Sequence, residues 1–233
     1  FGKKLLMKSI QTNLLFIIVL AVFTTKSYAN EMVIGIQVGP TVTNVLGKNN
    51  IFKPKADIRY AAEFYFKYYI SNKIAFRTGL GFEDKGYQFK NATFTDPGGN
   101  PIGTGKFQHH LQYITIPVLA EFTFGKKVQP YINTGFYFGI LAKAQDISKF
   151  QSDKVKSDVT QYINRFDMGF VVGAGINVPI KEKFLFNIDI RNSIGFLRTN
   201  KNANIFTNKR YNYSTAFNFG FAYKFGNKES TSK

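Results

Sequence analysis

Apolar and polar side chains alternate along this sequence with a period of two, in one segment after another. Successive side chains of a β-strand point to opposite faces, so this period predicts strands with one apolar and one polar face. The clearest segment ends the pattern, with apolar positions at Phe217, Phe219, Phe221, Tyr223 and Phe225. Eight such segments occur, at residues 33–43, 56–70, 74–88, 107–124, 128–142, 165–180, 184–196 and 213–225.

The connections between these segments alternate in length. Three of them are turns of three residues, at 71–73, 125–127 and 181–183. The other four are long and polar, at 44–55, 89–106, 143–164 and 197–212. Short turns at one end and long loops at the other are typical of outer-membrane barrels. The pattern therefore predicts an all-β fold, an eight-stranded antiparallel up-and-down transmembrane β-barrel with both termini on the periplasmic side.

The charged residues indicate which face of the barrel points inward. Eight strands enclose an interior just wide enough for side chains to fill, and a balanced set of charges can pair there. A soluble barrel with its apolar face inside would instead have to hold five or six large side chains per strand, which are too bulky. We therefore predict a polar lumen network of five acids and five bases: Arg59, Glu63, Lys67, Arg77, Glu83, Glu121, Asp167, Asp189, Arg191 and Lys224.

Composition agrees with a membrane barrel and excludes some other classes. Aromatic residues make up 17% of the chain and charged residues only 19%, whereas soluble domains have about 25% charged residues. The chain has no cysteine, which excludes disulfides and thiolate metal sites. The net charge is +17, but the bases are scattered through turns and loops, so no nucleic-acid partner is expected.

The first residues resemble a secretory signal. Three lysines precede ten apolar residues at 14–23, a stretch too short to span a bilayer as a helix, and Ser27 and Ala29 supply small residues before Asn30. An uncleaved anchor helix is the alternative. We predict a signal peptide at 1–29, a barrel at 30–226 and a C-terminal tail at 227–233, with translation starting at Phe1 or at Met7.

Two neighbouring segments resemble a known family. The stretch 113–119, which reads YITIPVL, is similar to a Y-x-x-I-P-L-L strand of the PorT-like outer-membrane β-barrel proteins, and 128–135 is similar to the next strand of that family. The resemblance covers the whole mature chain and implies a small adhesin-type or structural barrel; one branch takes part in protein secretion and gliding. It implies no catalytic site. Pro117 has no N–H to donate, which predicts a bulge or kink in that strand.

Few residues suggest chemistry. His109 and His110 are adjacent on a strand, point to opposite faces and cannot chelate one metal together. The Gly-rich loop at 98–106 lacks the spacing of a phosphate-binding loop and is expected to be a hairpin tip, whereas glycines in the segment 173–175 are expected either to let the barrel wall curve or to make room for a large lumen side chain. No catalytic residue, cofactor or metal is predicted.

The long loops suggest a role at the cell surface. The loop 197–212 contains four bases, Arg198, Lys201, Lys209 and Arg210, and no acid, while acids such as Asp57, Asp96 and Asp146 offset the bases of the other loops. This loop is either an anion-contact surface for lipopolysaccharide or a solvated connection. We expect a non-enzymatic barrel with a structural or surface-binding role, in contact with outer-membrane lipid, lipopolysaccharide and an envelope protein partner. A lipid A-modifying enzyme and a narrow pore are the alternatives.

The leader makes the first testable prediction. The protein that fractionates with the outer membrane is expected to begin near Asn30, because the small residues before that position fit a cleavage site. N-terminal sequencing of the membrane-bound form checks this. A membrane-bound chain that begins at Phe1 or Met7 would contradict cleavage.

Overall fold

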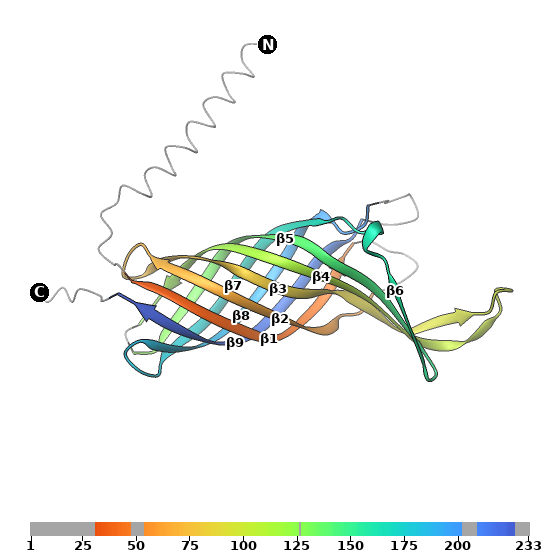
Figure 1. The fold of residues 1–233 in the computed structure, drawn as a ribbon, viewed down its shortest axis with the longest axis horizontal. Helices are drawn as coiled ribbons and strands as arrows, with labels where there is room; N and C mark the ends of the chain where they lie inside the picture. Colours follow the sequence, from red (N-terminus) through yellow and green to blue (C-terminus); the bar gives the residue numbers. More distant parts are fainter. Residues whose placement is uncertain (1–30, 48–53, 126, 202–208, 227–233) are drawn as a thin grey trace, which may run out of the picture.

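The computed structural model describes residues 31–47, 54–125, 127–201 and 209–226, which form nine strands and one short helix (Figure 1). No helix in these ranges is long and apolar enough to cross a membrane. The elements are β1 (Met32–Leu46), β2 (Asp57–Tyr69), β3 (Ile74–Thr95), β4 (Pro101–Thr123), β5 (Gln129–Phe150), β6 (Asp153–Asp158), η1 (Thr160–Tyr162), β7 (Phe166–Pro179), β8 (Phe184–Arg198) and β9 (Tyr211–Phe225).

Eight of the strands form a closed antiparallel ring. Each pairs with its neighbours in the order β1, β2, β3, β4, β5, β7, β8 and β9, and β9 pairs back onto β1 over Met32–Leu46. Closure leaves no strand edge with unpaired backbone groups, which a sheet surrounded by lipid requires. The eight-stranded barrel predicted from the sequence is confirmed. Within the described residues, β6 is the strand outside the ring, and it pairs only with β5.

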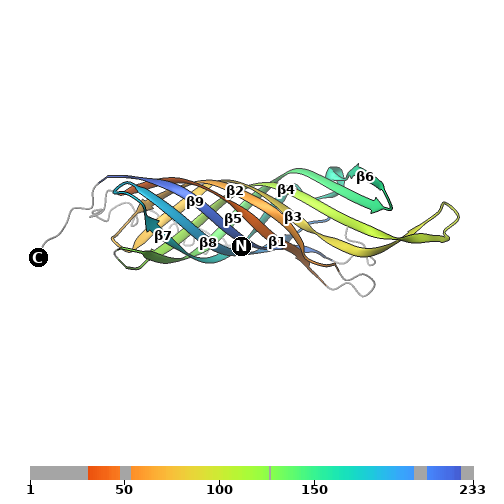
Figure 2. The same cartoon turned by 90° about the horizontal axis from the view of Figure 1, so that it is seen from below.

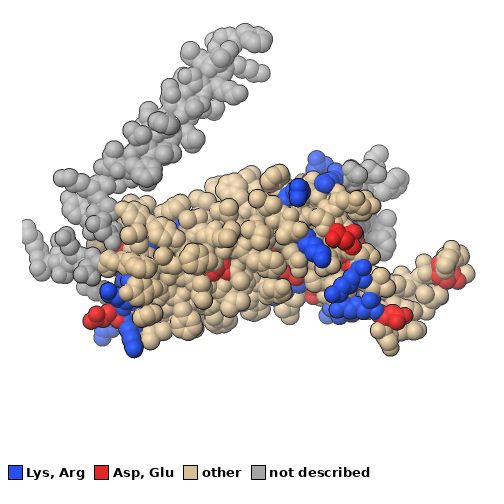
Figure 3. All heavy atoms as spheres, viewed as in Figure 1, with Lys and Arg blue, Asp and Glu red and all other residues tan. Residues whose placement is uncertain are grey.

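The alternation of side chains separates the two faces of the ring. Apolar side chains cover the outer face, with Phe219 49% exposed and its neighbour Phe221 57% exposed. The inner face carries polar side chains that are almost fully buried, such as Arg77 and Asn187 at 0% exposure. On the face that Figure 3 shows, a mostly uncharged band crosses the middle of the molecule, and Lys and Arg side chains gather near the two ends. This band is where the barrel faces lipid.

Tyrosine rings fill the lumen between the charges, and glycines on neighbouring strands make room for them. Tyr65 and Tyr131 are 0% and 2% exposed. A Cβ added to Gly35 or Gly175 would overlap the ring of Tyr65 or Tyr131, respectively. The expectation that glycine in the segment 173–175 admits a large lumen side chain is therefore confirmed.

Two of the predicted long loops are largely strand, and this part of the prediction was wrong. β3 and β4 continue as a paired hairpin to Thr95 and Pro101, and β5 continues to Phe150, where it turns back into β6. Only 96–100 forms the hairpin tip. There the backbone N–H of Asn100 donates to Asp96 and lowers the pKa of that carboxyl. Beyond the membrane both faces of a strand meet water, so the alternation fades although the backbone pairing persists.

Together these outer segments form a small sheet that we call the β-extension: residues 86–95 of β3, 101–112 of β4, 143–150 of β5, and β6. It projects beyond the ring at the end opposite the short turns, continuing along the barrel axis in both views (Figures 1 and 2). The irregularity in strand pairing does not lie at Pro117, where a bulge or kink was predicted. The β4–β5 register shifts between Gln112 and Tyr113, whereas at Pro117 the β4–β5 pairing continues and the β3–β4 register is unchanged on either side.

The face assignment makes a prediction about depth in the membrane. Phe219→Arg, near the middle of β9 on the outer face, is expected to lower the free energy of unfolding by about 2–4 kcal/mol, because a charge at the bilayer midplane is costly. Phe225→Arg, on the same face at the end of the strand, is expected to cost about 0–1 kcal/mol. Urea unfolding from lipid vesicles measures both. Equal losses would contradict this placement in the bilayer.

Candidate functional site

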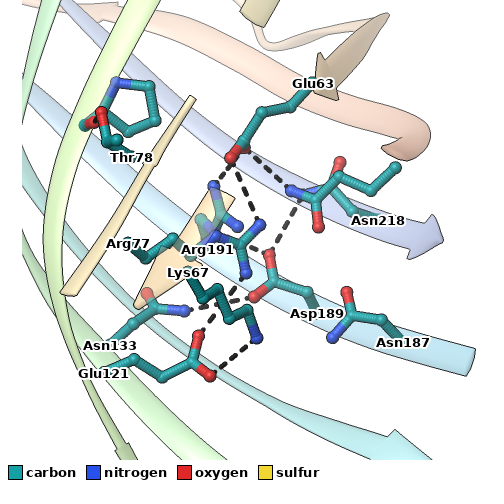
Figure 4. A network of polar contacts seen from close by, with 12 residues as sticks. Glu63, Lys67, Arg77, Thr78, Glu121, Asn133, Asn187, Asp189, Arg191 and Asn218 are labelled. Atoms are coloured by element: carbon teal, nitrogen blue, oxygen red, sulfur yellow. Dashed lines mark hydrogen bonds and ion pairs between the residues drawn. The ribbon is translucent and has the colours of Figure 1, made fainter. Parts of the chain in front are cut away.

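Charged side chains fill the centre of the barrel. Glu63 on β2 lies between two arginines: its Oε1 is 3.3 Å from Nη2 of Arg77, and its Oε2 is 2.5 Å from Nη1 of Arg191. Gln37 on β1 also donates a 3.0 Å hydrogen bond to Glu63. On the far side, Nε of Arg191 lies 2.8 Å from Oδ1 of Asp189. Four strands, β1, β2, β3 and β8, therefore contribute to one set of contacts (Figure 4).

The same chain of charges continues across the lumen. Nη1 of Arg77 lies 3.6 Å from Oε2 of Glu121 on β4, and Glu121 accepts a 2.7 Å hydrogen bond from Lys67. None of these three side chains is more than 1% exposed. Acids and bases alternate along the resulting central ion-pair chain, which runs through Asp189, Arg191, Glu63, Arg77, Glu121 and Lys67.

Aromatic and amide groups complete the surroundings of these buried charges. The guanidinium of Arg77 lies 4.0 Å from the ring centre of Tyr65, and the ammonium of Lys67 lies 4.7 Å from that of Tyr131. Tyr131 also donates a 2.8 Å hydrogen bond to Asp189. A buried ion pair costs least when the remaining hydrogen-bonding positions are also satisfied. The tyrosines supply cation–π contacts and hydroxyl donors for part of this set, while Nε of Arg77 and Nη2 of Arg191 have no hydrogen-bond partner among the described residues.

A second polar cluster lies closer to the long-hairpin end. Lys85 on β3 contacts Asp167 on β7 at 3.3 Å and Glu83 at 3.5 Å. Tyr137 and Asn212 donate hydrogen bonds of 2.9 Å and 2.8 Å to Asp167. Strands β3, β5, β7 and β9 therefore each contribute a polar side chain to one cluster around the carboxylate of Asp167. Polar contacts thus cross the interior at two levels, and the small buried cluster of Leu119, Tyr137 and Val171 lies beside them.

The β-extension closes one side of the barrel mouth. Pairing between β2 and β3 ends at Ala61 and Glu83. Beyond that point Arg59, on the inner face of β2, contacts Asp84 at 3.5 Å and also contacts His110. His110 shares the face of β4 that meets lipid lower down, at Ile114. The β3–β4 hairpin must therefore bend inward across the mouth.

Other contacts hold the hairpin in this position. Thr43 on β1 donates a 2.9 Å hydrogen bond to the carbonyl of Gly86 although β1 and β3 are not neighbours in the ring. Gln108 donates a 2.7 Å bond to Asp57, which also pairs with Arg59 at 2.7 Å. On the opposite face of the hairpin, Arg210 donates to the hydroxyl of Tyr87 and stacks over its ring.

The structure brings all ten residues of the predicted lumen network to the inner side of the barrel, and each forms an ion pair. Six belong to the central ion-pair chain, while Glu83 and Asp167 contact Lys85. Arg59 lies at the mouth, and Lys224 contacts Glu31 at 3.0 Å near the short-turn end. Sequence reasoning missed Asp57, Asp84 and Lys85. Asp57 was assigned to a loop, and the three consecutive charges at 83–85 break the alternation on which the face assignment rests.

The histidines have partners that the sequence did not predict. His109 is 8% exposed and contacts Asp146 on β5, while His110 contacts Asp84 at 3.1 Å rather than facing lipid. In the described part of the chain both histidines contact carboxylates, and no group of three or more His, Asp or Glu residues is placed to hold a metal ion. These Asp–His pairs connect strands of the mouth.

The four bases of the loop at 197–212 differ in their contacts. Arg198 ends β8, and Arg210 is held against Tyr87. Lys201 donates a 2.8 Å hydrogen bond to the carbonyl of Gln161, and Lys209 is exposed. The segment 202–208 lies outside the described residues. That these bases act together as an anion-contact loop therefore stays a prediction.

The space left in the middle of the barrel is small. A cavity of about 60 Å³ lies beside Glu63, Glu83 and Arg191, bounded by Tyr137 and Thr115. That volume holds roughly four water molecules. The arrangement therefore combines a lumen crossed by charged side chains with a mouth crossed by the β-extension, and it defines a small outer-membrane barrel.

Comparison with known proteins identifies the family. The chain belongs to the family described as outer membrane protein beta-barrel domain, whose model matches residues 25–199. Its location is therefore the bacterial outer membrane. The comparison with curated proteins gave no match.

Solved structures of three small barrels are similar to this chain. Neisserial surface protein A aligns at 11% identity with a TM-score of 0.48, over 84% of this chain and 100% of that one. OprG from Pseudomonas aeruginosa aligns at 16% identity with a TM-score of 0.47, over 85% and 97%. Ail, the attachment invasion locus protein of Yersinia pestis, aligns at 14% identity with a TM-score of 0.42, over 84% and 100%.

The central ion-pair chain makes a prediction about stability. Glu63→Ala leaves two buried arginines facing each other without the carboxylate between them, so the free energy of unfolding is expected to fall by about 3–5 kcal/mol. Glu182→Ala, in an exposed turn, is expected to change it by less than about 0.5 kcal/mol. Circular dichroism during urea unfolding from lipid vesicles measures both. Coinciding unfolding curves would show that the pairs contribute nothing.

Proposed function

We propose that this protein is a closed, non-enzymatic barrel that displays the β-extension outside the cell as a binding platform. In this proposal the long-hairpin end faces outward and both termini are periplasmic, after removal of the signal peptide at 1–29. The observation that carries it is the central ion-pair chain, which crosses the lumen from β8 through β2 and β3 to β4. A barrel whose interior is occupied in this way acts through its ends.

The contacts in the lumen argue against a pore. Opening a water path past Glu63 would separate it from Arg77 and Arg191 and leave each of these charges without its partner. Breaking such buried pairs costs several kcal/mol each. The mouth adds a second barrier, because Arg59 and Arg210 hold the hairpin across it from both sides.

The polar groups of the mouth also argue against a lipid A-modifying enzyme. Acyl transfer or hydrolysis would require a nucleophile beside one of the histidines. His109 and His110 instead contact Asp146 and Asp84. Ser214, which lies on the inner face of β9, donates a 2.5 Å hydrogen bond to Glu83. These groups connect strands of the barrel.

The β-extension has the properties expected of a binding surface. Its strands are paired, and its base is fixed to β1 and β2 by Thr43 and Asp57. A partner therefore meets a surface whose shape is already set, which lowers the entropy cost of binding. Because the protein lies in the outer membrane, we expect outer-membrane lipid and lipopolysaccharide to surround the barrel.

The finer family assignment is a further part of this proposal. The PorT-like motifs at 113–119 and 128–135 lie on adjacent strands, with Pro117 paired to Tyr137. They supply the buried lumen residues Tyr113, Leu119 and Tyr131. A PorT-like barrel would have an envelope protein as its partner, and affinity purification from outer membranes with mass spectrometry tests this.

Conductance separates the closed barrel from the pore. The purified protein in a planar lipid bilayer is expected to give no stable conductance steps. The double variant Glu63→Ala and Arg191→Ala removes two side chains from the middle of the central ion-pair chain. It is expected to produce conductance steps, because this pair spans the lumen. Slower migration of boiled than of unboiled protein on a gel shows that each variant has folded. Steps from the unaltered protein would overturn the closed-barrel proposal.

A further inference from the structure

One face of the β-extension carries a row of lysines across three adjacent strands. Lys106 on β4 lies directly opposite Lys149 on β5, and Lys149 lies directly opposite Lys154 on β6. Residues opposite each other on antiparallel strands have Cα atoms about 5 Å apart, so the three ammonium groups occupy a span of roughly 10 Å. We call Lys106, Lys149 and Lys154 the lysine row.

Two more lysines extend this charge. Lys156 lies two residues beyond Lys154 on β6 and so shares its face. Lys90 lies on β3 in the register shift opposite Lys106. Figure 3 shows Lys and Arg side chains gathered at this end of the molecule.

Acids of the chain do not neutralise the row. Among the described residues, none of these five lysines forms an ion pair within 4.0 Å. Asp146 contacts His109, and Asp153 lies opposite Phe150 on the other face. Asp158 accepts the backbone N–H of Thr160, which with Lys143 lowers the pKa of its carboxyl. The sequence of the segments 48–53 and 202–208 contains no acid.

Protection of an exposed strand edge explains only part of this pattern. Lysines on an edge strand discourage pairing with another chain, and this accounts for Lys154 and Lys156 on β6. Lys106 and Lys149 lie in strands that are paired on both sides. Like charges directly opposite each other destabilise a sheet. Something other than edge protection is therefore needed to explain the two inner lysines.

The position of the row favours a ligand beyond the lipid headgroups. Lys106 lies eight residues beyond Ile114, an outward-facing apolar residue of β4 that is 39% exposed. At about 3.3 Å per residue and a tilt of ~40°, the row stands roughly 20 Å beyond that level. The headgroup zone extends only about 5–8 Å outside the hydrocarbon.

We propose that the lysine row binds a linear anionic polysaccharide outside the outer leaflet. The neighbours of Lys106 on this face of β4 are Thr104 and Gln108, which are polar, whereas the rings of Phe94 and Phe150 pack together on the other face. A protein partner would require an apolar centre in its interface. A straight row of charges, flanked by the exposed Thr104 and by the buried side chains of Gln108 and Ile147, instead matches a polymer that carries repeated sulfate or carboxylate groups. This inference deepens the proposed role as a binding platform by naming the ligand class.

Titration of the folded protein in phosphatidylcholine nanodiscs tests the site. Dextran sulfate and polygalacturonate are expected to bind, and neutral dextran is not. The triple variant Lys106→Gln, Lys149→Gln and Lys154→Gln is expected to weaken binding on the order of tenfold or more near physiological salt, and high salt is expected to weaken binding of the unaltered protein as screening sets in. The matched control removes the same charge at exposed positions of the same end: Lys55→Gln, Lys143→Gln and Arg165→Gln.

Each outcome decides for or against the proposal. Replacing the three lysines of the row by arginine should retain binding, which separates lost charge from lost folding. Equal weakening in the triple variant and in the matched control would overturn the site. Poly-glutamate or phosphatidylglycerol vesicles that bind as tightly as the polysaccharides, with the same dependence on the row, would overturn the ligand class. A conducting barrel that still binds polysaccharide would refute only the closed-barrel proposal, and a closed barrel without row-dependent binding would refute only this one.

Discussion

Charge pairing inside the lumen is the interaction on which the rest of this barrel depends. The central ion-pair chain places three acids and three bases in alternating order, nearly all of them excluded from solvent. Each charge is tolerable only because its neighbours in the chain have the opposite sign. The strands must therefore keep the stagger that brings Arg191 to Glu63 and Glu121 to Lys67, and this requirement fixes the barrel as a packed, narrow cylinder.

In the proposed function, a lumen crossed by ion pairs leaves the end of the barrel as the part that acts. β3, β4 and β5 continue beyond the ring, and the hairpin they form is anchored across the mouth by Thr43, Asp57 and Arg59. Charged side chains differ in their pairing on the two sides of this anchored segment. Inside the mouth acids and bases neutralise each other, whereas on the β-extension Lys106, Lys149 and Lys154 have no acid partner among the described residues. The first arrangement stabilises the fold, and the second leaves attraction available for a ligand.

Much of the fold was predictable because it depends on local alternation. The eight strands of the ring, the inward placement of Glu63 and Arg77, and the space that Gly175 gives Tyr131 all follow from a period of two and from side-chain size. The outer hairpins were not predictable in this way, since residues 89–95 and 101–106 meet water on both faces and show no amphipathic pattern. Asp84 and Lys85 were missed because three charges follow one another there.

The sequence by itself determined the class of protein. A membrane barrel follows from a period of two in eight segments, from short turns that alternate with long connections, and from charges on one face. Only the tertiary structure decided which charges pair. Glu63 and Arg191 are 128 residues apart, and their contact depends on how the strands are staggered around the ring, which no single strand encodes. The lysine row was likewise invisible in the sequence, because Lys106 and Lys149 become neighbours only when β4 and β5 pair in their observed register.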